Sequence, residues 1–219
     1  MRIVHALTRK PWTTAQGIID NHYPGDTFQK PKGKLGLRFL MAVISVIFFL
    51  FVIAYGSRMA LVDWRPAPPQ SVLWLNTVWL VLSSIGLQWA RMGARANRID
   101  RVSVGLVVGG VFAIAFLTGQ SLAWRQLDNL PSFGISNPAI AFFYLITMAH
   151  ALHVVGGLVA WIRTMEKVWR GYSVERVRQG VELCATYWHF LLVIWLVLFA
   201  LIFSGNTQMA FLLKVCGLK

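Results

Sequence analysis

The sequence predicts an all-α integral membrane protein, built as a bundle of five transmembrane helices. Of its 219 residues, 57% are hydrophobic and only 13% are charged, whereas soluble domains average about 25% charged residues. Five apolar runs are each long enough to cross a hydrocarbon core of about 30 Å, which takes roughly 20 helical residues. The sequence lacks the alternating segments of about ten residues that are typical of transmembrane barrels.

The five runs are separated by segments typical of loops. The runs lie at roughly 35–56, 71–90, 102–124, 138–163 and 181–204. Between them come the proline-rich "DWRPAPPQ", the basic "RMGARANRIDR", the turn-forming "RQLDNLPSFGISNP" and the charged, amphipathic "RTMEKVWRGYSVERVRQG". The sequence therefore predicts a polar arm over 1–34, a helix bundle over 35–204 and a short tail over 205–219.

The distribution of Lys and Arg predicts the orientation. Alternate loops, starting with the N-terminal arm, hold 16 of the 21 basic residues, and the opposite side holds five. Cytoplasmic loops carry the excess of Lys and Arg, so we expect the N-terminus in the cytoplasm and the C-terminus outside. Because the basic residues lie in the gaps between apolar runs, the net charge of +13 indicates topology rather than nucleic-acid binding. The arm is expected to lie on anionic lipid, with docking onto a partner subunit as the alternative.

The second and third runs carry polar and small residues that we expect to face other helices. On the second run these are Asn76, Ser83, Ser84 and Gln88, which lie on overlapping stripes. On the third run, Gly105 and Gly109 form a GxxxG pair that indicates close helix packing. Trp124, near the outer end of the third run, is interpreted as an interfacial anchor.

The fourth and fifth runs carry the histidines. His150 and His153 are three positions apart on the fourth run, where Gly156 and Ala160 form a small pair that would let another helix approach. On the fifth run Glu182, Thr186 and His189 share one stripe, and Trp188 and Trp195 share another. Cys184 and Cys216 would lie on opposite sides of the bilayer, so we expect no disulfide between them.

Two interpretations of the histidines are open. Haem ligation would need opposed histidines at matching depth, and a two-histidine metal site would need a nearby carboxylate or thiolate, whereas the one intramembrane acid, Glu182, lies near a helix end. The favoured interpretation is that the imidazoles form hydrogen bonds between the fourth and fifth helices. A proton pump or transporter is disfavoured, because the first three runs have no interior Asp or Glu.

Two motifs resemble subunit III of the haem–copper terminal oxidases, in its five-helix form. "AFFYLITMAHALHVVGG" (141–157) is similar to the family's Phe-Tyr…His-x-x-His-Val…Gly stretch, and "ELCATYWHFLLVIWLVLF" (182–199) to its Glu-x4-Tyr-Trp-His-Phe…Trp stretch. "LNTVWLVLSS" and "GQSLAW" match more loosely. The motif positions implied by this resemblance are His150, His153, Gly157, Glu182, Tyr187, Trp188, His189 and Trp195.

The resemblance implies a non-catalytic subunit without a cofactor of its own, in a bacterial inner membrane. Haems and copper would be held by partner subunits, with catalytic subunit I and also subunit II as partners, and phospholipid would be bound. In this interpretation Tyr187, Trp188 and His189 lock the bundle by hydrogen bonds. The alternatives are a similar accessory protein of a quinol oxidase or nitric oxide reductase and, from another class, a stand-alone haem-binding electron carrier.

Three positions depart from the family pattern. A glutamate that follows a serine in many members is Val46 here, the Gln-x-x-Glu of some members ends in Ala123, and an Asp common after Tyr-Trp-His-Phe is replaced by Leu192. These losses argue against a direct role of the chain in carrying protons.

Overall fold

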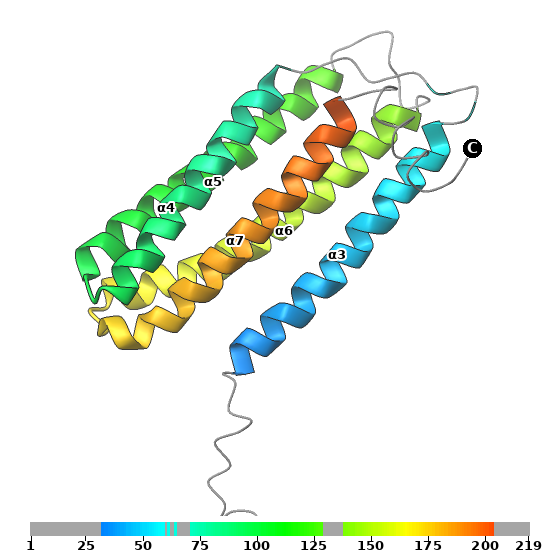
Figure 1. Cartoon of the computed structure of the whole chain (residues 1–219). Helices are drawn as coiled ribbons and strands as arrows, with labels where there is room; N and C mark the ends of the chain where they lie inside the picture. Colours follow the sequence, from blue (N-terminus) through cyan, green and yellow to red (C-terminus); the bar gives the residue numbers. More distant parts are fainter. Residues whose placement is uncertain (1–31, 60, 62–63, 65–70, 129–137, 204–219) are drawn as a thin grey trace, which may run out of the picture. The chain divides into compact units, whose positions relative to one another are not determined.

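The computed structural model describes residues 32–59, 61, 64, 71–128 and 138–203, and this part of the chain is all-helical. Its five helices are α3 (Lys32–Met59), α4 (Val72–Arg95), α5 (Ile99–Asp128), α6 (Pro138–Trp169) and α7 (Val174–Phe203), as Figure 1 shows. Each is long and apolar enough to cross a membrane. The prediction of a five-helix, all-α membrane protein is confirmed. The orientation of the termini remains a prediction, and the tail and nearly all of the arm, with Cys216, lie outside the described residues.

The helices extend beyond the apolar runs wherever the flanking residues still favour helix. The charged segment expected as a connector after the fourth run is mostly helical, because α6 continues to Trp169 and α7 starts at Val174. An ion pair four residues apart, between Arg170 and Glu166 at 2.5 Å, supports the end of α6. Hydropathy reports which residues lie in lipid, whereas the helix continues as long as its backbone hydrogen bonds can form.

Two short turns on one side of the bundle join the helices. Asn97 after α4 has φ 57° and Gly171 after α6 has φ 74°, the left-handed conformation that closes many helix ends. At the first turn the Arg98 N–H donates to the Gly93 carbonyl at 2.9 Å, which is the six-to-one bond of a Schellman motif. Glycine adopts this conformation without strain, and asparagine is one of the few other residues that tolerate it, so these two residues permit the tight reversals.

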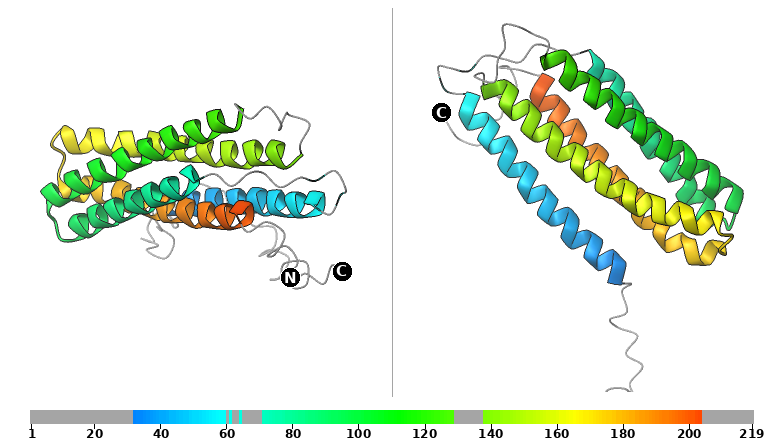
Figure 2. Two further views of the ribbon diagram at one scale, coloured as in Figure 1. Left: turned by 90° about the horizontal axis from the view of Figure 1, so that it is seen from above. Right: turned by 180° about the vertical axis from the view of Figure 1, so that it is seen from behind.

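Glycines allow α4 and α5 to pack closely, and the two helices run side by side in Figures 1 and 2. A Cβ atom placed on Gly105 would lie 2.6 Å from the backbone nitrogen of Ala90, and one on Gly109 would lie 2.7 Å from a Leu87 carbon. The predicted close packing at Gly105 and Gly109 is confirmed. The last helix, α7, packs on both α4 and α6, and α6 also packs on α5.

The first helix of the described part has few protein neighbours. In its most apolar window 11% of the residues are buried, against 33–44% in the other four helices. It touches α6 through aromatic rings: Phe48 lies 5.5 Å from His153 between ring centroids, and Tyr55 lies 6.0 Å from Phe142. The remaining surface of α3 is apolar and exposed, as expected of a helix that faces lipid or a partner subunit.

The glycine of α6 that packs against another helix is Gly157, one position after the predicted Gly156. Gly156 is exposed, and a Cβ atom there would meet no atom of the described residues within 4 Å. On Gly157, a Cβ atom would lie 2.8 Å from the Trp188 ring. One residue turns a helix by about 100°, so the described α7 approaches the Gly157 face, and the expectation for Gly156 and Ala160 does not hold within this part of the chain.

Candidate functional site

The His189 side chain joins α7 to α4. Its Nδ1 lies 2.5 Å from Ser84 Oγ and its Nε2 lies 3.1 Å from Gln88 Oε1. An amide oxygen only accepts hydrogen bonds, so Nε2–H donates to Gln88, and Nδ1 accepts the Ser84 hydroxyl proton. One neutral tautomer therefore satisfies both ring nitrogens. The expectation that the imidazoles tie the fourth helix to the fifth is wrong for His189, because its partners lie on the second.

The contact between α6 and α7 uses hydroxyl groups instead. Tyr187 Oη donates to the backbone carbonyl of His153 at 3.2 Å, and Thr164 Oγ1 lies 3.6 Å from Cys184 Sγ. The His153 ring turns back to its own helix, with Nδ1 2.6 Å from the Ala149 carbonyl. His153 thus contributes its backbone, and not its imidazole, to the link between the two helices.

His150 is fully buried among aromatic rings. Its ring centroid lies 6.2 Å from that of Phe48, 5.7 Å from that of Phe116 and 5.2 Å from that of Trp195. Neither ring nitrogen forms a hydrogen bond with another described residue. His150 therefore acts as a packing residue where α3, α5, α6 and α7 meet.

The two motif tryptophans of α7 are also buried and have different roles. Trp188 lies against Gly157, which leaves room for the indole because it has no side chain. Trp195 Nε1–H donates to Thr77 Oγ1 of α4 at 2.9 Å. Of the three adjacent residues, Tyr187 and His189 hydrogen-bond to other helices, whereas the Trp188 Nε1 atom has no hydrogen-bond partner among the described residues.

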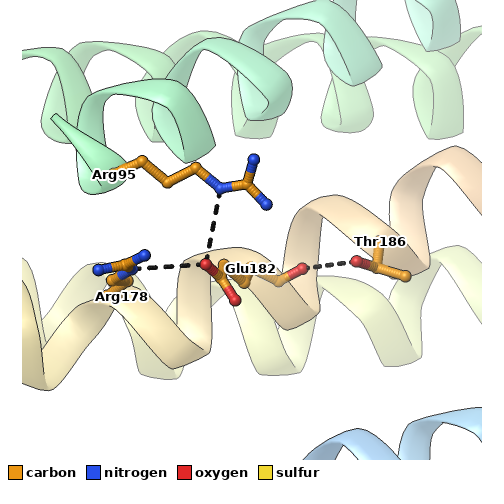
Figure 3. A network of polar contacts seen from close by, with 4 residues as sticks. All are labelled: Arg95, Arg178, Glu182 and Thr186. Carbon is orange, nitrogen blue, oxygen red and sulfur yellow. Dashed lines mark hydrogen bonds and ion pairs between the residues drawn. The ribbon is translucent and has the colours of Figure 1, made fainter.

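Glu182 lies near the start of the apolar part of α7, between two arginines (Figure 3). Its Oε1 atom is 3.7 Å from Arg95 Nε and 3.5 Å from Arg178 Nε. The glutamate side chain is 14% exposed, against 54% and 53% for the two arginines. Thr186 Oγ1 donates to the Glu182 carbonyl at 2.8 Å. The arrangement is an ion-pair cluster at one end of the helices, joining α4 to α7.

Further polar contacts between helices were not predicted from the sequence. They comprise an amide pair from Asn76 Nδ2 to Gln120 Oε1 at 3.2 Å, a hydroxyl from Ser83 to the Gly109 carbonyl at 2.6 Å, and indole donors from Trp124 to Thr147 at 3.0 Å and from Trp161 to the Leu106 carbonyl at 2.9 Å. Trp124 therefore has a partner inside the bundle.

The expectation that Asn76, Ser83 and Ser84 face the bundle is confirmed, since all three are buried.

The site residues are spread along the bundle. The structure places Glu182 at one end, His189 further along the α4–α7 contact, and His150 with Trp195 in an aromatic cluster. Within the described residues, no group of three or more His, Cys, Asp or Glu side chains is placed to hold a metal ion. Of the departures from the family pattern, Val46 is exposed, Leu192 is partly buried and Ala123 is fully buried. Among the predicted site residues, the side chains of Tyr187, His189 and Trp195 form hydrogen bonds between helices.

Comparison with known proteins identifies the family. A family model described as cytochrome c oxidase subunit III matches residues 18–206. A relative from Mycobacterium tuberculosis, described as "Probable cytochrome c oxidase subunit 3", is 30% identical over 161 residues, which cover 70% of this chain and 78% of the relative. The cytochrome c oxidase subunit 3 of Chondrus crispus is 28% identical over 203 residues (86% and 71%), and that of Arabidopsis thaliana is 28% identical over 185 residues (78% and 69%). The chain therefore belongs to the cytochrome c oxidase subunit III family.

Proposed function

We propose that the chain is the structural, non-catalytic subunit III of a cytochrome c oxidase, in which it supports oxygen reduction without taking part in the chemistry. The observation that carries this proposal is the use of the polar motif residues. His189, Tyr187 and Trp195 each hydrogen-bond to another helix of the same chain. Polar groups inside a membrane are commonly functional, and here their function is to hold the helices in one arrangement.

The partners that we propose are the catalytic subunit I and also subunit II, which would hold the haems and copper. This chain would stabilise subunit I and its proton-uptake region. The exposed apolar surface of the bundle, such as Phe39, Phe49 and Val46 on α3, offers area for a partner helix or for lipid. The family assignment supports a multisubunit complex, and the cofactors assigned to the partners follow from that assignment.

For the location we propose the bacterial inner membrane, with the N-terminus in the cytoplasm. The chain is a multi-pass membrane protein by its family and its five membrane-spanning helices. The excess of Lys and Arg in alternate loops supports the orientation. The same membrane supplies phospholipid, which we expect to bind this subunit.

The proposal is tested by purifying the tagged full-length chain from its native membranes in a mild detergent. Mass spectrometry of the accompanying proteins is expected to identify a haem–copper catalytic subunit together with a subunit II that carries a copper-binding cysteine pair. An untagged strain serves as the control for adventitious proteins. Recovery of nitric oxide reductase subunits, or of a quinol oxidase without the copper-binding subunit, would contradict the assignment to a cytochrome c oxidase.

A further inference from the structure

A polar pocket lies between the α4–α5 turn and the first turns of α7. It has a volume of about 170 Å³ and is lined by Ala94, Arg95, Asn97, Glu175 and Arg178. Its two arginines are those that flank Glu182 in Figure 3. The pocket therefore lies at the end of the bundle where the short turns are, directly beside the ion-pair cluster.

The two arginines contact Glu182 through one of their nitrogen atoms each. Each approaches the same carboxylate oxygen of Glu182 most closely through its Nε atom. The contacts drawn from Arg95 and Arg178 to Glu182 in Figure 3 end on these Nε atoms. A guanidinium carries five N–H donors in a planar fork that suits phosphate oxygens. Glu182 thus holds both guanidinium groups beside the pocket while their outer donors remain available.

The charge around the pocket favours an anion. Among its lining residues, Arg95 and Arg178 are cationic and Glu175 is the one carboxylate. Glu175 lines the pocket itself and repels a second negative charge, so the pocket favours a singly charged ligand. A phosphodiester carries one negative charge, whereas a phosphate monoester carries about −1.5 to −2 at pH 7.

The position of the pocket fits a lipid head group. Its residues lie just outside the apolar runs, because the second run ends near 90 and the fifth begins near 181. Arg95, Asn97 and Arg178 therefore lie at the level where the bilayer changes from hydrocarbon to phosphate. Basic residues at this level attract anionic lipids by about 1 kcal/mol each, and charge-assisted hydrogen bonds from arginine to phosphate are stronger than neutral ones.

We propose that this pocket binds the phosphodiester of an anionic phospholipid, held by the outer guanidinium donors of Arg95 and Arg178 and by the Asn97 amide. The inference rests on the phospholipid binding proposed for this subunit and gives it a specific place, at the junction of α4, α5 and α7. The bound phosphate would join the α4–α5 turn to the start of α7 from outside, as Glu182 joins α4 and α7 from inside.

The test uses the complete complex purified through the full-length chain and placed in nanodiscs of about one part phosphatidylglycerol to four parts phosphatidylcholine. Native mass spectrometry would count the phosphatidylglycerol retained per complex. In Arg95→Gln/Arg178→Gln we expect retention at this site to weaken roughly tenfold, through loss of two charge-assisted contacts. Because that variant also removes both partners of Glu182, Asn97→Asp provides a second test. Aspartate tolerates the left-handed backbone of Asn97, leaves the ion pairs intact and places a negative charge in the pocket, so retention should again fall.

Arg176→Gln is the matched control. Arg176 lies on the same end of α7, two positions from Arg178, and its guanidinium carbon is 6.0 Å from the Tyr172 ring, but it does not line the pocket. We expect this variant to retain the lipid like the native complex. Equal loss in Arg176→Gln, full retention in Asn97→Asp, or displacement of the lipid by inorganic phosphate would overturn the proposal. If every variant still purifies with the oxidase subunits in normal yield, unchanged lipid retention counts against the lipid site alone and leaves the oxidase assignment standing.

Discussion

The Nδ1 atom of His189 on α7 lies 2.5 Å from the hydroxyl oxygen of Ser84 on α4, although the two residues are 105 positions apart. Together with the bond from Nε2 to Gln88, this contact satisfies the imidazole completely inside the bundle. A metal or haem iron binds one imidazole nitrogen, and here each nitrogen already has a hydrogen-bond partner that it would have to give up first. The histidine of the Tyr-Trp-His motif is therefore a structural link between two helices.

Replacing His189 with Leu should destabilise the chain. The substitution leaves the Ser84 hydroxyl and the Gln88 amide without their partner, and polar contacts between membrane helices contribute about 0.6–2 kcal/mol each. We expect a lower yield of assembled complex and a lower midpoint of thermal unfolding in detergent. The haem spectrum of the complex that survives should be unchanged. Loss of a haem band in proportion to the variant chain would contradict the structural role.

The same substitution at His150 should be milder. His150 has no hydrogen-bond partner among the described residues and is enclosed by Phe48, Phe116 and Trp195. Leucine removes the cost of a buried, unpaired polar group, which is about 1–3 kcal/mol, and this gain offsets the lost ring contacts. Unfolding midpoints of the two His→Leu variants, measured side by side, are the check. A larger loss for His150→Leu than for His189→Leu would show that its imidazole has a polar partner.

Gly157 and Gly156 form a matched pair for testing the contact between α6 and α7. Leucine at Gly157 would collide with the Trp188 ring, and overpacking of this kind costs about 1–3 kcal/mol or more. Gly156 is exposed, and a Cβ atom there would meet no described residue within 4 Å. We therefore expect Gly157→Leu to lower the unfolding midpoint of the full chain and Gly156→Leu to leave it nearly unchanged. Equal midpoints for the two variants would mean that Gly157 does not lie at the interface.

Replacing Glu182 with Gln should have a small, salt-dependent effect. Arg95 and Arg178 are half exposed, and ion pairs of exposed groups contribute about 0.2–1 kcal/mol. We expect a modest decrease in stability at low ionic strength that shrinks as salt is added, because salt screens exposed charges. Thermal unfolding of both proteins across a salt series measures the difference. A large decrease that persists at high salt would indicate that Glu182 has a more deeply buried role.

The number and type of the helices could be predicted from the sequence because the bilayer sets the length of an apolar helix. The ends of the helices could not, since hydropathy does not report where helical hydrogen bonding stops. Residues 164–169 and 174–180 illustrate this difference. Both segments are charged enough to suggest a loop, and both are helical in the structure.

The buried positions were predictable, whereas their partners were not. The stripe of a helix that carries His189 follows from the helical period, but the neighbour that faces this stripe depends on how the helices are arranged. His189 therefore pairs with α4 although the sequence suggested α6. Trp124 is a second example. Its place near the end of an apolar run predicted an interfacial residue, but its hydrogen bond to Thr147 of α6 depends on how α5 and α6 are aligned, which the sequence does not give.

The central claim is that the motif histidines are structural residues of the helix bundle, with His189 linking α7 to α4, and that they do not bind a cofactor. It is tested most directly by the visible absorption spectrum of the full-length chain after its partner subunits have been stripped away, with the intact complex as the positive control. The account predicts that the haem bands stay with the partner subunits and that the chain alone shows none. A haem band that remains with the isolated chain and disappears in His150→Leu or His189→Leu would contradict it.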